Sequence, residues 1–93
     1  MIVSFKDKET ENIFNEILSR KFPKEIQRSA LRKLYSIDAA QDVDDLRIPA
    51  GNRLEKLKGN RNGQYSIRVN DQYRICFKWT SGNAEYVEIT DYH

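Results

Sequence analysis

The chain of 93 residues has one cysteine, one histidine and no long hydrophobic run. The single cysteine, Cys76, has no partner for an internal disulfide, and its apolar neighbours favour a buried side chain. One histidine and one cysteine cannot supply a metal-ligand cluster, so we expect neither a metal nor another cofactor. The charged residues that follow Met1–Phe5 leave no segment for a signal peptide or membrane span, which predicts a cytoplasmic protein without membrane contact.

Positive charge is distributed unevenly along the sequence. The formal net charge is only +2, but residues 47–78 carry eight basic side chains against Glu55 and Asp71, a local net charge of +6. A concentrated positive region on a nearly neutral chain is typical of a protein that binds a phosphate-bearing partner. A solvated basic surface without function is the alternative interpretation. The length and the 39% of hydrophobic residues fit a single domain over residues 1–93.

The first half of the sequence predicts a short strand over residues 2–5 and then two helices. Asp7 or Thr10 is placed to cap the first helix, whose apolar face is predicted to hold Ile13, Phe14, Ile17 and Leu18. Pro23 interrupts this helix and suits the first turn of the second. The second helix has an apolar stripe formed by Ile26, Ala30, Leu34 and Ile37. Residues 38–52 then form a connection, with one helical turn expected around 43–46.

In the second half the hydrophobic period changes from helical to two. Strands are predicted over 65–69, 73–79 and 87–90, separated by turn-forming clusters at 59–63, 70–71 and 81–83. One face of this sheet carries apolar side chains, which are Tyr65, Ile67, Val69, Tyr73, Ile75, Phe77, Trp79, Val87 and Ile89. We therefore predict an α+β fold in which two N-terminal helices pack on one face of a small, mostly antiparallel sheet.

The opposite face of the predicted sheet mixes basic side chains with tyrosines. Strict alternation places on it Ser66, Arg68, Arg74, Cys76, Lys78, Tyr86, Glu88, Thr90 and Tyr92. An uncovered face of this composition would hold single-stranded nucleic acid by its phosphates and stack on a base. The side chains predicted to bind RNA are Arg53, Lys56, Arg61, Arg68 and Lys78.

Four motifs, in this order, resemble those of the HigB toxins, a branch of the RelE/ParE toxin superfamily. They are Leu57-Lys58-Gly59, the stretch from Gly63 to Arg68, the stretch from Tyr73 to Phe77, and the terminal Asp91-Tyr92-His93. The opening residues and Asp38-Ala39-Ala40 also fit, so the resemblance spans nearly the whole chain. It implies a RelE/ParE-like fold and a toxin of a type II toxin-antitoxin system that cuts mRNA in the ribosomal A site.

The same resemblance implies partners and site residues. The partners are a helix-turn-helix antitoxin of the HigA type, the ribosome and mRNA, with operator DNA bound only through the antitoxin complex. Matched onto this sequence, the family's active-site lysine is Lys58 and its arginine is Arg74, followed by the terminal trio Asp91, Tyr92 and His93. Glu55 stands where some members carry a histidine, so its role is open.

RNA cleavage without a metal requires a base, positive charge at the phosphate and an acid for the leaving oxygen. Arg74 suits the charge because a guanidinium is always protonated and grips phosphate with two hydrogen bonds, although an ion pair with Glu88 is the alternative. His93 suits proton transfer, since histidine titrates near neutral pH. Lys58 suits phosphate positioning and Tyr92 suits stacking or a phosphate contact. Glu55 is a candidate base if a bulge or strand end after Leu57 brings it beside Lys58.

Two other functions share the predicted fold or the basic face. ParE-like members of the superfamily poison DNA gyrase, and fold alone does not separate them from nucleases. They generally lack the terminal Asp-Tyr-His, so its presence here favours the nuclease. A non-catalytic RNA-binding module would explain the basic face but gives no reason for that ending.

Overall fold

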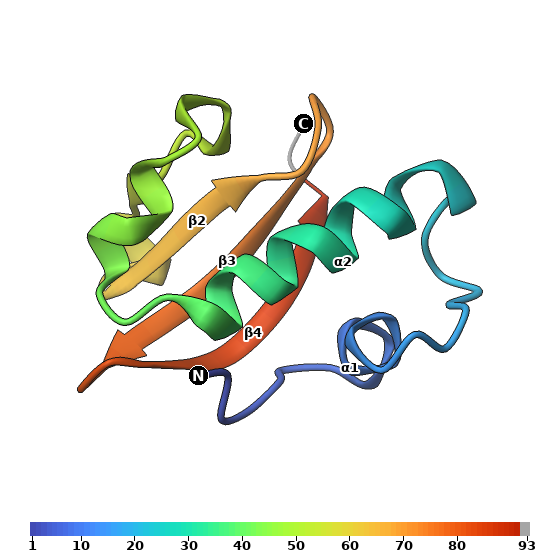
Figure 1. The fold of residues 1–93 in the computed structure, drawn as a ribbon, viewed down its shortest axis with the longest axis horizontal. Helices are drawn as coiled ribbons and strands as arrows, with labels where there is room; N and C mark the ends of the chain where they lie inside the picture. The colour runs from blue at the N-terminus through green and yellow to red at the C-terminus, as the bar shows by residue number, and fades with distance from the viewer. Residues whose placement is uncertain (92–93) are drawn as a thin grey trace.

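The computed structural model describes residues 1–91, and Figure 1 shows helices packed against a sheet. The helices are α1 (Lys8–Phe14) and α2 (Lys24–Ala39), and the strands are β1 (Glu55–Lys56), β2 (Gln64–Arg68), β3 (Tyr73–Thr80) and β4 (Asn83–Asp91). The 3-10 helices η1 (Val43–Arg47), η2 (Ala50–Asn52) and η3 (Gly59–Arg61) lie between α2 and β2. The strands pair antiparallel in the order β1-β2-β3-β4, so the predicted fold class is confirmed.

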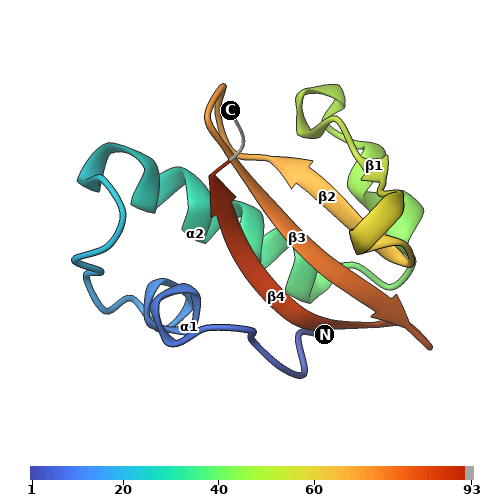
Figure 2. The same cartoon turned by 180° about the vertical axis from the view of Figure 1, so that it is seen from behind.

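The core lies between α2 and the sheet, as Figure 2 shows from the side of the sheet away from the helix. Its fully buried side chains include Leu34 and Ile37 of α2 and Ile67, Ile75 and Phe77 of the strands. All nine apolar side chains predicted for this face belong to the core cluster or pack against it. Burial of each large aliphatic side chain contributes about 1.5–3 kcal/mol. No helix within residues 1–91 is long and apolar enough to cross a membrane.

The first helix ends earlier than its hydrophobic pattern predicted. Asp7 is the N-cap, as expected, but α1 stops at Phe14 and leaves Ile17 and Leu18 54% and 62% exposed. The termination is a Schellman motif: Glu16 adopts φ 62° and donates to Ile13 at 3.0 Å, and Ile17 donates to Asn12 at 2.8 Å. The prediction that Ile17 and Leu18 extend the buried face was wrong, because a glutamate at the left-handed position gives no sequence signal for a helix end.

The N-terminal segment covers the outer edge of β4 instead of forming a full strand. Ile2 and Phe5 form isolated parallel bridges with Ala84 and Val87, so the strand predicted over residues 2–5 is reduced to two contacts. Further along the same edge, the backbone N–H of Ile89 donates to the hydroxyl of buried Thr10 at 3.0 Å. The edge of β4 is thereby protected against pairing with another chain.

A β-bulge in β4 breaks the alternation on which the face assignments depended. Cys76 pairs with Glu88, but Lys78 pairs with Glu85, so β4 holds one extra residue in this interval. Tyr86 adopts φ 54° there and is exposed. Past the bulge, Glu85 takes the position opposite Lys78 that strict alternation had given to Tyr86. The predicted place of Tyr86 among the basic residues was therefore wrong.

Candidate active site

Arg74 lies on the sheet face opposite α2 and is held by oxygen atoms of two neighbouring segments. Its Nε donates to the hydroxyl of Ser66 at 2.8 Å, and its Nη2 donates to the Arg53 carbonyl at 2.7 Å. The carboxylate of Glu55 forms an ion pair with Nη2 at 4.0 Å, while the Arg74 side chain is only 13% exposed. The guanidinium is therefore fixed in direction before any ligand binds, and it carries positive charge at the rim of the sheet.

The chain before β1 is folded so that the carbonyl of Arg53 faces Arg74. Arg53 follows η2 and adopts the left-handed conformation, with φ 47° and ψ 55°. Beside it, fully buried Asn52 donates to the carbonyl of Leu46 at 3.1 Å and accepts a hydrogen bond from Lys33 of α2. A buried asparagine thus anchors the turn that presents the Arg53 carbonyl.

Glu55 and Lys58 line one hollow of about 430 Å³, together with Lys56, Leu57 and Arg61. Glu55 and Lys58 were expected to share a site only if a bulge or strand end followed Leu57, and the strand in fact ends one residue before Leu57. β1 ends at Lys56, Leu57 is buried, and Lys58 is the N-cap of η3. Because Glu55 also pairs with Arg74, the three predicted residues Glu55, Lys58 and Arg74 come together at this edge of the sheet.

A second hollow, of about 350 Å³, adjoins the other side of Arg74. It is lined by Arg53, Arg68, Asn70, Asp71 and Arg74, with Arg68 in an ion pair with Asp71. Lys33 of α2 adds another basic side chain near Arg68, and burial, followed by repulsion from Arg32 and Arg68, lowers the pKa of Lys33. Lys33 could not be predicted here from the sequence, because the apolar stripe of α2 does not indicate which of its polar residues lies near Arg68.

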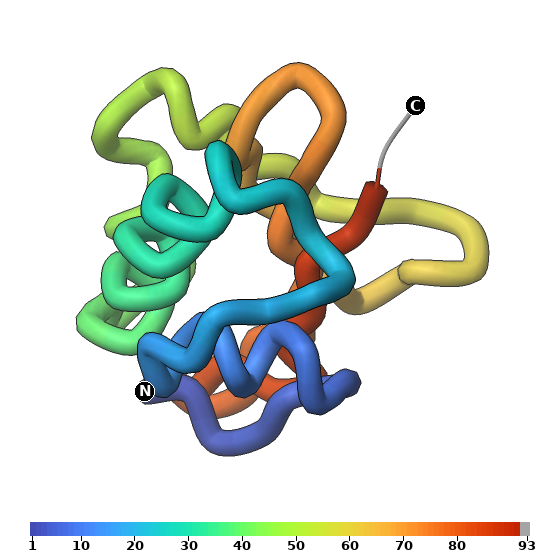
Figure 3. Tube along the Cα trace, turned by 90° about the vertical axis from the view of Figure 1, so that its right-hand side faces the viewer, coloured from blue at the N-terminus to red at the C-terminus, as the bar shows by residue number. Residues whose placement is uncertain are grey.

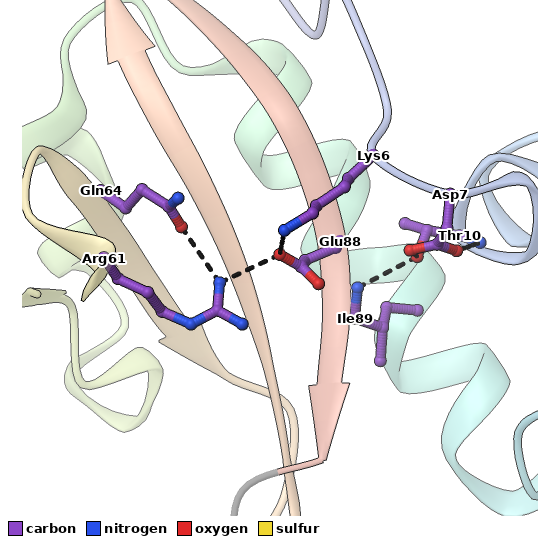
Figure 4. Close-up of polar contacts among 7 residues, drawn as sticks. All are labelled: Lys6, Asp7, Thr10, Arg61, Gln64, Glu88 and Ile89. Atoms are coloured by element: carbon purple, nitrogen blue, oxygen red, sulfur yellow. Dashed lines mark hydrogen bonds and ion pairs between the residues drawn. The ribbon is translucent and has the colours of Figure 1, made fainter.

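The middle of the basic face is not open. Figure 3 shows the segment between β1 and β2, in yellow, on the side of the sheet away from α2. In Figure 4 the side chain of Arg61 reaches over the sheet to Glu88, which it contacts at 3.0 Å, and donates to Gln64 at 3.2 Å. Lys6 contacts the same Glu88 oxygen at 3.4 Å from the other side.

This network corrects the prediction that the sheet face is uncovered. Ser66 and Cys76 are fully buried, so the face is not the uncovered surface that alternation predicted. Arg61, predicted to bind RNA, forms an ion pair with Glu88. Glu88 thus pairs with Arg61 and Lys6, whereas the ion pair of Arg74 is with Glu55. Cys76 is buried, as the sequence predicted, and burial raises the pKa of its thiol.

The third cluster of predicted site residues is at the end of β4. Asp91 is its last residue and accepts a hydrogen bond from Gln72 at 3.2 Å. Asp91 pairs with Tyr73 in the ladder, whereas Arg74 pairs with the preceding Thr90, so Asp91 projects to the other face from Arg74. The structure does not bring Asp91 into the hollow of Glu55 and Lys58. Tyr92 and His93 lie outside the described residues.

The fold that carries this site is that of the YoeB toxins. The chain superposes on YoeB in the YoeB-YefM complex from Staphylococcus aureus with a TM-score of 0.62 and 19% identity, covering 100% of this chain and 98% of that one. The YoeB dimer from the same organism gives a TM-score of 0.61 at 22% identity, covering 100% of this chain and 97% of that one. Likeness at this level of identity shows the fold alone.

Sequence comparison identifies the family. Residues 3–93 match the model of the HigB-like toxins, described as the RelE-like toxin of type II toxin-antitoxin system HigB. Toxin HigB-1 of Vibrio cholerae is 48% identical over 85 residues, covering 90% of each chain. Endoribonuclease HigB of Proteus vulgaris is 32% identical over 93 residues, covering 100% of both. The chain therefore belongs to the HigB family of RelE-like toxins from type II toxin-antitoxin systems.

Proposed function

We propose that the chain is a ribosome-dependent mRNA endonuclease that inhibits translation and needs no metal. The observation that carries this proposal is the fixed guanidinium of Arg74, which adjoins Glu55 and the hollow that holds Lys58. An arginine held by neutral oxygens keeps its full charge for a phosphate. Family membership and the activity named for the Proteus vulgaris relative support the same reaction.

In the proposed reaction, the ribose 2′-oxygen attacks the neighbouring phosphorus while the bond from phosphorus to the 5′-oxygen breaks. Arg74 stabilises the charge of the pentacoordinate phosphate, an effect worth about 2.7–4 kcal/mol for one donor in comparable sites. Glu55, 59% exposed in its side chain, takes the 2′-hydroxyl proton, and Lys58 holds the phosphate. We assign proton donation to the 5′-oxygen to His93, because a histidine side chain can donate a proton near neutral pH. The family resemblance also names Asp91 and Tyr92 as site residues.

The remaining basic residues bind the RNA strand at positions distant from the scissile bond. Arg53 and Arg68 line the second hollow beside Arg74, and Lys56 lines the hollow of Glu55. Lys78 is exposed on β3. Arg61 contributes mainly by holding η3 against Glu88, so we assign it a weaker direct role in RNA binding. The RNA strand would lie along β1 and η3, with Arg74 at the start of β3 and Lys78 near the end of β3.

The proposed partners follow from family membership. They are a HigA-like helix-turn-helix antitoxin, the ribosome and mRNA, with operator DNA bound only through the antitoxin complex, and the proposed compartment is the cytoplasm. A YoeB toxin of the same fold was solved as a complex with YefM. The basic charge of residues 47–78 suits ribosomal RNA as well as message.

The proposal is tested with purified protein, ribosomes programmed with a defined mRNA, and the same mRNA without ribosomes. We expect cuts within the A-site codon only when ribosomes are present, and a loss of about 10²–10³-fold in rate for Arg74→Ala. Arg28→Ala, an exposed arginine of α2, is the matched control and should cleave like wild type. Intact mRNA together with inhibition of DNA gyrase would contradict the proposal and favour the ParE-like alternative.

A further inference from the structure

We propose that Ser66 is a positioning residue that orients the guanidinium of Arg74 for the phosphate. This inference rests on the proposed nuclease function and assigns a role to a residue that the motif comparison left without one. Ser66 is on β2 and fully buried, although its hydroxyl is polar. That hydroxyl accepts a hydrogen bond from Arg74 Nε at 2.8 Å, and the Ser66 carbonyl accepts from Nη2 at 3.4 Å.

The register of the sheet explains why the contact forms. Ser66 pairs with Cys76, and Arg68 pairs with Arg74, so Ser66 lies diagonally across from Arg74 on the same face. The Arg53 carbonyl completes the arrangement at 2.7 Å from Nη2. Nε and Nη2 are therefore held from two segments, and the plane of the guanidinium is set by the strand and the turn before β1.

Neutral acceptors suit this purpose better than a carboxylate would. A serine hydroxyl and two backbone carbonyls fix the direction of the guanidinium without cancelling its charge. The carboxylate of Glu55, which forms an ion pair with Arg74, lies at 4.0 Å with its side chain mostly exposed. Misplacement of a catalytic group by about 1 Å can lower a rate 10²-fold, so loss of the Ser66 acceptor is expected to show in the chemical step.

The test measures single-turnover cleavage of ribosome-bound mRNA over a range of toxin concentrations. For Ser66→Ala we expect the maximal rate to fall about 10–100-fold while the half-saturating concentration changes less than about threefold. The pH profile should keep its shape, because neither serine nor arginine titrates near neutral pH. Ser66→Cys, assayed with a reducing agent because free Cys76 lies opposite it, fills the buried space with a weak acceptor. It should show the same fall and guards against a folding defect.

Two further variants separate positioning from a general loss of structure. Cys76→Ala is the matched control, because Cys76 is equally buried and is the cross-strand partner of Ser66, and it should retain the wild-type rate. In an Arg74→Ala background, Ser66→Ala should lower the residual rate no further, since the group that it orients is gone.

The outcomes distinguish this inference from the proposed function. Ser66→Ala and Ser66→Cys with wild-type rates, beside an inactive Arg74→Ala, would overturn the role of Ser66 alone. A further loss in the double variant, or a shifted pH profile, would also overturn it, because Ser66 would then act independently of Arg74. Wild-type cleavage by Arg74→Ala would overturn the proposed function itself.

Discussion

The Glu88→Gln substitution tests whether the ion-pair network holds η3 against the sheet. Glu88 is 14% exposed in its side chain and contacts Arg61 at 3.0 Å and Lys6 at 3.4 Å. Replacing a charged hydrogen-bond acceptor by a neutral one costs about 1 kcal/mol, from about 1.5–3 down to about 0.5–1.5. The Lys6 pair, exposed on the lysine side, adds under about 1 kcal/mol. We expect a total loss of about 1.5 kcal/mol.

For a domain of this size, that loss lowers the melting temperature by about 6–12 °C, measured by circular dichroism. Lys6→Gln removes only the outer contact of the same carboxylate and should lower it by a few degrees at most. A Glu88→Gln protein that melts within 2 °C of wild type (roughly the limit of such a comparison), or a Lys6→Gln protein that is destabilised equally, would refute this reading of the network.

Three further predictions concern two buried groups away from the hollows, Thr10 and Cys76. Thr10→Val removes the acceptor of the Ile89 N–H at a fully buried position, so urea unfolding should show a loss of about 1–3 kcal/mol, and an unchanged midpoint would contradict this. Cys76 should resist iodoacetamide until the protein is unfolded, because it is buried and its thiol pKa is raised. Because folding raises the thiol pKa, the protonated thiol stabilises the native state at pH values below the unfolded pKa of 9.0. This stabilisation is lost as the pH rises through the pKa of the folded state. The stability of wild type relative to Cys76→Ala should therefore fall above about pH 9, and a constant difference would contradict the shift.

The sequence predicted the parts of the fold that depend on regular periodicity. The apolar stripe of α2 and the alternating strands placed Leu34, Ile75 and Phe77 correctly in the core. A hydrophobic period of 3.6 residues for a helix, or of two for a strand, can be recognised directly in the sequence. The turn clusters at 59–63 and 70–71 also fell between the strands as expected, whereas the cluster at 81–83 overlaps the start of β4 at Asn83. Errors came where the backbone departs from the period without a glycine, at Glu16 after α1 and at Tyr86 in the bulge.

The sequence predicted which residues form the candidate site better than it predicted their contacts. The motif comparison assigned Lys58 and Arg74 to the site and left the role of Glu55 open, and the structure brings these three to one edge of the sheet. The sequence could not reveal that a backbone carbonyl of Arg53 binds Arg74, since carbonyls have no residue signature. It also could not reveal that Arg61 folds back onto Glu88, because that ion pair joins residues 27 positions apart.

The central claim is that the chain cuts mRNA inside translated codons. The most direct measurement is primer-extension mapping of mRNA 5′ ends in cells that express the protein without an antitoxin, alongside Arg74→Ala and His93→Ala. The account predicts growth arrest with new 5′ ends inside codons for wild type, and neither effect in the two variants. Growth arrest with intact messages, or the same new ends in His93→Ala, would contradict it.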